Sequence, residues 1–445
     1  MRNRESTSYR ASFALLTVLF FLWGFITVLV DSLVPRLKEL FTLSYSQAVM
    51  VQFAFFGAYF LLSVPSSLII ARIGYKRGII LGLLTMAFGC LLFYPAAAFR
   101  EFSIFLLAYF ILAGGITLLQ VAANPFVTAL GSEEGASSRL NLSQAFNSLG
   151  TAIAPAVGAL FILSSSVKNE LEINDLSNSA REAYYLAEAS AVQRPFLGLA
   201  LFIVCIALVF LFAKLPLIID EKSSGTYAQA FQNKNLMLGV AGIFFYVGAE
   251  VSIGTFLVNY FQTSGMIEHI RGNGLMMGVA NTVATIFFKT LEGADDKALL
   301  GIFVMFYWSG AMVGRFIGSY LTKVLKPGKV LAFFAVMAAT MILISISSTG
   351  LISMWSILAV GFFNSIMFPT IFSLALEGTG DLKPIASGLL CMAIVGGAII
   401  PLISGWIIDV AGFNVAFMSI VLCYVYILFY GYHHKKIVGV NTNLS

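Results

Sequence analysis

Twelve runs of apolar residues dominate the sequence, and each is about as long as a helix must be to cross the hydrocarbon layer of a membrane, roughly twenty residues. Charged residues, glycine or proline separate one run from the next. The runs lie at 13–34, 50–71, 77–98, 102–130, 142–163, 195–217, 236–261, 299–325, 329–349, 351–376, 385–409 and 412–432. The sequence therefore predicts an all-α integral membrane protein with twelve transmembrane helices.

The composition agrees with this prediction. Of the 445 residues, 59% are hydrophobic and 11% are charged, whereas soluble proteins carry roughly 25% charged residues. The net charge of +5 is small and sits largely in loops, which indicates membrane orientation rather than nucleic-acid binding. The basic N-terminal segment precedes a span-length run without a small-residue cleavage site, so we expect a first span and not a removed signal peptide.

Metal, disulfide and enzyme chemistry find little support. The cysteines all lie inside apolar runs without metal-ligand spacing, so we expect no disulfide, no metal site and no cofactor. The three histidines, His269, His433 and His434, lie outside the predicted spans, and no nucleophile–base constellation or His-Glu-x-x-His motif is present. An embedded enzyme is therefore not expected.

One further stretch, Gly274 to Leu291, is only moderately apolar and contains Asn281, Thr282, Thr285 and Lys289. We interpret it as a re-entrant or interfacial part of a long loop rather than a thirteenth span. The surrounding connection, residues 265–298, has no assigned function.

Lysine and arginine set the expected orientation. With both termini on one side, that side receives about sixteen of these residues against about nine in the opposite loops, so the positive-inside rule places both termini in the cytoplasm.

An internal repeat divides the chain. The segment that begins at Gly57 aligns without gaps on the segment that begins at Gly310, and GTAIAP at Gly150 matches GGAIIP at Gly396. The span that contains Pro125 corresponds likewise to the span that contains Pro369. The offsets are all close to half the chain length, although apolar helices can also align by chance. We predict two six-helix bundles, at 1–219 and 236–445, joined by a cytoplasmic linker at 220–235.

Asp31 is the first candidate for function because it is a carboxylate near the end of the apolar run Phe20–Pro35. A charge at the bilayer centre costs about 2.5–3.5 kcal/mol by one measure and more than about 10 by another, so such residues usually face a cavity. One interpretation is a proton or cation coupling site. The alternative is that Asp31 lies past the apolar core and pairs with Arg36 or Lys38.

Amides occupy the fourth and fifth spans in pairs. Gln120 and Asn124 are four residues apart on one helical face, and Gln144 and Asn147 are three apart. Amides both donate and accept hydrogen bonds, as sugar hydroxyls do, so they suit a cavity for a polyhydroxy solute. The alternative is that they join packed helices to one another.

The seventh span adds Glu250, with Tyr246 one turn before it and Asn259 further along. Glu250 can approach the same cavity from the second half and share the coupling role, or it can be a structural partner of Arg315. For Arg315, the loop acids Glu377 and Asp381 are equally suitable partners. Among the many aromatic residues, Trp23 and Phe126 are the candidates for stacking on a sugar ring.

Four motifs together are similar to a known family: LWGFITVLVDSLVPRL, TLLQVAANPFVTALG, RLNLSQAFNSLG and NSIMFPTIFSLAL. They resemble the fucose and glucose/galactose proton-symporter family of the major facilitator superfamily. The resemblance implies two bundles, alternating access and proton-coupled monosaccharide transport. It places the proton carrier at Asp31 and substrate-binding amides at Gln144 and Asn147, and the last motif begins at a further candidate, Asn364. The family's fourth-span acid is replaced by Gln120, which favours the glucose/galactose branch over the fucose branch.

The sequence thus predicts a multi-pass protein of the bacterial cytoplasmic membrane, monomeric in the bilayer, that imports a hexose or a related sugar with a proton. The alternatives are sodium coupling and a sugar receptor that does not transport.

Overall fold

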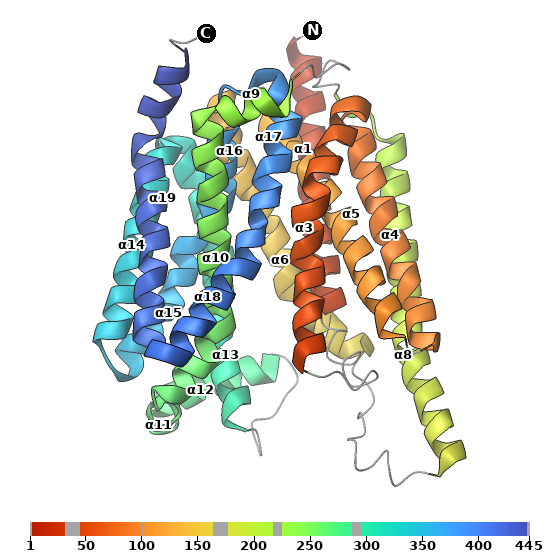
Figure 1. Cartoon of the computed structure of the whole chain (residues 1–445), viewed down its shortest axis with the longest axis vertical. Coiled ribbons are helices and arrows are strands. Elements are labelled where there is room, and N and C mark those ends of the chain that lie inside the picture. Colours follow the sequence, from red (N-terminus) through yellow and green to blue (C-terminus); the bar gives the residue numbers. More distant parts are fainter. Residues whose placement is uncertain are drawn as a thin grey trace. The chain divides into compact units, whose positions relative to one another are not determined.

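A computed structural model describes residues 2–31, 45–99, 101–162, 177–216, 225–286 and 295–442. Throughout these ranges the regular structure is helical (Figure 1). The predicted linker begins at 220, and its residues up to 224 lie outside the described ranges. Its remainder forms the short helix α9, Tyr227–Gln232, which begins with a capping box in which Thr226 and Gln229 bond to each other's backbone.

The helices form two compact units. Unit 1 comprises residues 1–130, 146–225 and 387–392, and unit 2 comprises residues 131–145, 226–386 and 393–445. Two helices are therefore shared, α6 (Ala136–Ile162) and α17 (Lys383–Met392). The exchanged segments are the first part of α6, which belongs to unit 2, and most of α17, which belongs to unit 1.

Unit 1 is built around α4 and α5, which pack along each other and against α3 and α8. The helices of unit 1, besides the shared α6 and α17, are α1 (Arg2–Asp31), α3 (Tyr45–Ile73), α4 (Tyr75–Phe99), α5 (Phe102–Ala129) and α8 (Asn178–Phe212).

Unit 2 is built around α10, which packs against α16, α18 and α19, while α14 packs against α15 and α19. Its helices are α9, α10 (Lys234–Thr263), α11 (Met266–Arg271), α12 (Gly274–Ile286), α13 (Asp296–Val324), α14 (Pro327–Ser347), α15 (Gly350–Asn364), α16 (Met367–Ala375), α18 (Gly396–Ala411) and α19 (Phe413–Thr442).

Every predicted span corresponds to helical structure. Eleven helical segments within the described ranges are long and apolar enough to cross a membrane, and α6 corresponds to the predicted span 142–163. The tenth span consists of α15 and α16, and the eleventh consists of α17 and α18 with a short 3-10 turn between them. The stretch predicted as interfacial or re-entrant contains α12, which has 13 residues and is too short to span the hydrocarbon. In unit 2, α11 and α12 lie at the far end of α10 from α9 (Figure 1).

Two proline-containing spans are stabilised in an equivalent way. A proline inside a helix leaves the carbonyl four residues earlier without its usual donor. Pro125 frees the carbonyl of Val121 in α5, and the Ser387 hydroxyl donates to this oxygen at 2.9 Å. Pro369 follows the break between α15 and α16 and frees the carbonyl of Ser365, which accepts from Arg315 Nε at 3.1 Å. A side chain from another helix therefore replaces each missing backbone donor.

Glycine allows close helix crossings inside both units. A Cβ at Gly89 of α4 would lie 2.6 Å from the Leu112 nitrogen of α5, and a Cβ at Gly361 of α15 would lie 2.0 Å from the Tyr307 carbonyl oxygen of α13. Any larger residue at these positions must separate the two backbones, so the crossings require glycine.

We expect Gly361→Ala to destabilise unit 2, because the clash is with backbone that no side-chain rotation relieves. Overpacking of this kind costs about 1–3 kcal/mol, so the purified variant should have a lower Tm in detergent. Gly301→Ala in α13 is the matched control, since a Cβ there meets no atom within 4 Å. Equal Tm values for the two variants would contradict the close crossing of α13 and α15.

Candidate functional site

Unit 1 places two candidate amides on α5, and one of them contacts α3. The Gln120 amide of α5 donates to the Tyr59 hydroxyl of α3, and both residues are buried. Asn124 lies one turn further along α5 and is fully buried, yet neither its amide nitrogen nor its amide oxygen has a hydrogen-bond partner among the described residues. Buried polar groups are normally paired, so Asn124 is equipped to bind something that the chain itself does not supply.

The amide of Asn147 is partly used for helix packing. Its nitrogen donates to the Phe20 carbonyl of α1 at 2.9 Å, and a Cβ at Gly24 would lie 2.8 Å from the same nitrogen. Asn147 is neither fully buried nor fully exposed. This contact agrees with the structural alternative, and the substrate-binding role of Asn147 stays a prediction.

The remaining candidates from the first half are placed as follows. Trp23 is 6% exposed, and its ring lies 5.3 Å from that of Phe20. Phe126 is 1% exposed and stacks on Tyr75 at 5.6 Å, so little of its ring is available to a ligand. Gln144 lies in the part of α6 that belongs to unit 2 and is 6% exposed. Asp31 is the last residue of α1, and its side chain lies outside the described part of the structure.

In unit 2 a chain of hydrogen bonds connects residues of α10, α13, α15 and α19. The Asn364 amide of α15 donates to the Tyr307 hydroxyl of α13 at 2.8 Å and accepts from the Tyr424 hydroxyl of α19 at 2.8 Å. Tyr307 donates in turn to the backbone carbonyl of Glu250 in α10 at 3.3 Å. Because its amide already bonds on both sides, Asn364 is used chiefly to connect three helices.

Glu250 and Tyr246 present polar atoms beside this chain. The Oε1 atom of Glu250 and the hydroxyl of Tyr246 are both buried, neither makes a hydrogen bond of standard geometry within the described residues, and the two side chains lie close enough to interact with each other. Arg315 of α13 attracts Glu250 electrostatically, which supports the partner considered from the sequence. Asn259 lies more than two turns beyond Glu250 on α10 and is exposed, so the structure does not bring it to this cluster.

Tyr59, Tyr307 and Tyr424 complete these two clusters, but the sequence does not distinguish them from other aromatic residues. Tyrosine and phenylalanine occur in nearly every span, and only the helix packing shows which hydroxyls meet an amide. The polar partners Gln120 and Asn364 are the only signal that could have directed attention to them.

We expect the two buried asparagines to differ in their effect on stability. Asn364→Leu leaves the buried Tyr424 hydroxyl without its acceptor, at about 1–3 kcal/mol, and removes the amide donor to Tyr307, which keeps its bond to the Glu250 carbonyl, so the Tm of this variant should fall. Asn124→Leu removes an unpaired buried amide, so its Tm should stay the same or rise. Thermal unfolding of both variants in detergent measures the difference. An equal loss in the two variants would show that Asn124 has a structural partner.

Comparison with known proteins agrees with this architecture. The Major Facilitator Superfamily model matches residues 15–392. A glucose/galactose transporter of Brucella abortus (biovar 1, strain 9-941) is 47% identical over 436 residues, which cover 97% of this chain and 96% of the relative. The L-fucose-proton symporter of Escherichia coli (strain K12) is 33% identical over 417 residues, which cover 92% and 89% of the two chains.

Among solved structures, the transporter FucP in its outward conformation matches with a TM-score of 0.84 and 30% identity, over 96% of this chain and 99% of the other. The predicted fold class, twelve membrane-spanning helices in two six-helix bundles, is thereby confirmed. This chain belongs to the major facilitator superfamily, and within it to the family of the glucose/galactose transporters and the L-fucose-proton symporters.

Proposed function

We propose that the protein is a secondary active transporter that imports a monosaccharide, a hexose such as glucose or galactose, together with a proton. The near-complete match to transporters with these substrates carries the proposal. Transport in this superfamily proceeds by alternating access, in which two bundles rock about a binding site that both of them line. The protein acts as a carrier and not as an enzyme.

Sugar binding is assigned to the buried amides. Asn124 carries a donor and an acceptor without partners among the described residues, and Gln120 next to it holds Tyr59 in a fixed place. A sugar hydroxyl can both donate to an amide oxygen and accept from an amide nitrogen, so sugar binding would supply the hydrogen bonds that Asn124 lacks. Gln144, Asn147 and Trp23 of the same half, and Tyr246 of the other, are the further residues proposed to contact the sugar.

Proton coupling is assigned to Asp31. It is the only acidic residue in the first six predicted spans, because the fourth span carries Gln120 where the fucose branch has an acid. A carboxylate surrounded by hydrocarbon binds a proton more readily and can then cross in the neutral form. Glu250 is the second candidate, since its Oε1 is buried and its charge is attracted by Arg315.

The distribution of lysine and arginine supports a cytoplasmic position for both termini. We propose accordingly that the end of unit 2 that carries α9 faces the cytoplasm of a bacterial cell. We also propose that the protein works as a monomer.

Counterflow in proteoliposomes tests the proposed function. Vesicles loaded with unlabelled glucose or galactose should transiently accumulate the labelled sugar from outside, because a carrier exchanges the two, driven by the outward gradient of unlabelled sugar and without an ion gradient. A panel that includes fucose and an amino sugar identifies the preferred substrate. Sugar binding without any counterflow would show that the protein is a receptor, and dependence on a sodium gradient would replace the proton as coupling ion.

We expect Asp31→Asn to abolish uphill sugar accumulation driven by a proton gradient and to spare counterflow, because exchange needs no proton release. Asp409→Asn is the matched control, since Asp409 is an exposed acid at the end of the eleventh span and should not affect accumulation. Glu250→Gln is measured in parallel. If only the Glu250 variant loses accumulation, the coupling role belongs to Glu250 and the assignment of Asp31 is wrong.

A further inference from the structure

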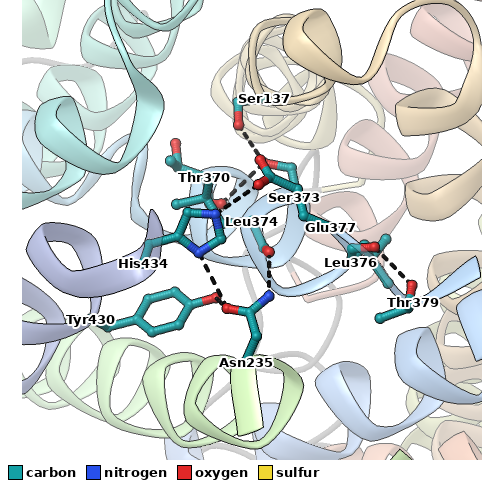
Figure 2. Close-up of polar contacts among 10 residues, drawn as sticks. All are labelled: Ser137, Asn235, Thr370, Ser373, Leu374, Leu376, Glu377, Thr379, Tyr430 and His434. Atoms are coloured by element: carbon teal, nitrogen blue, oxygen red, sulfur yellow. Dashed lines mark hydrogen bonds and ion pairs between the residues drawn. The ribbon is translucent and has the colours of Figure 1, made fainter. Parts of the chain in front are cut away.

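A cluster of polar side chains lies at the α9 end of unit 2, outside the proposed sugar site. It contains Asn235 from α10, Tyr430 and His434 from α19, and Glu377, which follows α16 (Figure 2). We refer to these four residues as the His434 cluster. Neither the proposed coupling nor the proposed sugar binding uses any of them.

His434 makes a polar contact on each side of its ring. Its Nε2 atom lies 2.7 Å from Glu377 Oε2, and its Nδ1 atom lies 3.2 Å from Asn235 Oδ1. The histidine side chain is 3% exposed, whereas that of Glu377 is 31% exposed and reaches solvent. The cluster is therefore a nearly buried ring held between an acid and an amide.

The orientation of Asn235 decides which form of the ring fits. Its Nδ2 atom donates to the Leu374 carbonyl at 2.8 Å, so Oδ1 is the atom that faces the ring, and it also accepts from the Tyr430 hydroxyl at 3.2 Å. Oδ1 is an acceptor, and so is an ionised Glu377 carboxylate. Both ring nitrogens must donate to make both bonds, which only the imidazolium can do.

Loss of one proton from the ring therefore removes one of its two hydrogen bonds. Histidine ordinarily changes charge between about pH 5 and 8, within the physiological range. The full set of bonds exists only in the protonated ring and is lost when the ring releases its proton. Other charged or titratable side chains occur on the elements packed against the ring, namely Lys234 on α10, Lys326 and Lys329 on α14, Asp381 after Glu377, and Tyr426, His433, Lys435 and Lys436 on α19.

The His434 cluster fixes the end of α16. Asn235 binds the carbonyl of Leu374 in the last turn of this helix, and Glu377 is held by the histidine just beyond it. Earlier on the same helix, Ser373 and Thr370 lie one turn apart. Both hydroxyls therefore lie on the helix whose end the His434 cluster bonds.

Ser373 and Thr370 bond to the first part of α6. The hydroxyls of Ser373 and Ser137 lie 2.5 Å apart (Figure 2), and the Asn141 amide donates to Thr370 Oγ1 at 3.1 Å. All four residues are buried. A second pair, Ser138 and Ser319 of α13, exchanges hydrogen bonds between hydroxyl and carbonyl at 2.8 and 3.0 Å.

The internal repeat places an equivalent bond in unit 1. Asn141 and Ser387 are separated by the same number of residues as Gly150 and Gly396 of the repeated motif. Ser387 bonds to α5, as Asn141 bonds to α16, and α5 and α16 carry the corresponding prolines. Each half thus contributes one segment to the opposite unit, and these hydrogen bonds hold each segment there.

We propose that His434 is a positioning residue that makes the closure between α6 and α16 depend on the pH at the α9 end of the protein. The imidazolium holds α16 where Ser373 and Thr370 meet α6, and loss of its proton weakens these bonds and favours opening. This inference rests on the proposed alternating access and orientation. It gives a transporter that brings in protons a means of responding to the pH on the side where they are released.

The test measures access to Ser373, which is 3% exposed, by maleimide labelling of Ser373→Cys in detergent without sugar. The rate is divided at each pH by that of the same cysteine variant carrying His434→Gln, which cancels the thiol's own pH dependence. The ratio should be well below one at pH 5.5 and rise toward one at pH 8. The expected change is about tenfold, as for loss of one hydrogen bond to a charged group.

Two further variants keep the outcome decisive. His433→Gln changes the adjacent, partly exposed histidine and should leave the pH profile as it is. Glu377→Gln should flatten the profile as His434→Gln does, and it replaces that variant if the latter fails to fold. A ratio that is constant between pH 5.5 and 8, or a profile that His433→Gln flattens equally, would overturn the proposal. The labelling needs no sugar, so a failure of counterflow would contradict the transport proposal separately.

Discussion

The need to satisfy every backbone polar group within a membrane governs this structure more than any other constraint. Water is not available there to bond a free carbonyl, yet the chain places a proline in two equivalent spans. The freed oxygens of Val121 and Ser365 are bonded by Ser387 and Arg315, which come from other helices. The prolines therefore tie each irregular span to a particular neighbour, and the polar clusters of both units lie on the helices positioned in this way.

The buried asparagines of the two halves differ in their hydrogen bonding. Asn364 bonds to two tyrosines and joins three helices, whereas Asn124 is equally buried and has no partner among the described residues. An unpaired buried amide is costly, and a chain normally removes such a cost unless a ligand supplies the missing bonds. This asymmetry is the reason for proposing sugar recognition chiefly in the first half, while Glu250 of the second half lies beside a set of hydrogen-bonded side chains.

The exchanged segments of α6 and α17 bear on the proposed alternating access. Each contributes to the unit formed mainly by the other half, and each makes hydroxyl or amide hydrogen bonds there. Hydrogen bonds of this kind contribute only about 0.5–1.5 kcal/mol each, so a few of them hold a conformation without making it permanent. A titratable ring that positions one of these contacts can consequently shift the balance.

The amino-acid sequence by itself determined the all-α membrane fold, the approximate positions of the spans and the family. These follow from the length of apolar runs, from short motifs and from the exclusion of charge from hydrocarbon, all of which are local properties of the chain. It also identified Gln120, Asn124, Glu250 and Pro125 as polar or irregular positions within spans.

Only the tertiary structure decided how these residues are used. It showed that Asn364 connects helices, that Phe126 stacks on Tyr75, and that Asn259 is exposed, because partners on other helices determine whether a polar or aromatic side chain is already occupied. It also showed that His434, which the sequence placed outside the spans, is buried between Glu377 and Asn235. Hydrogen bonds between helices depend on packing between residues far apart in the chain, and a pattern along one helix carries no information about them.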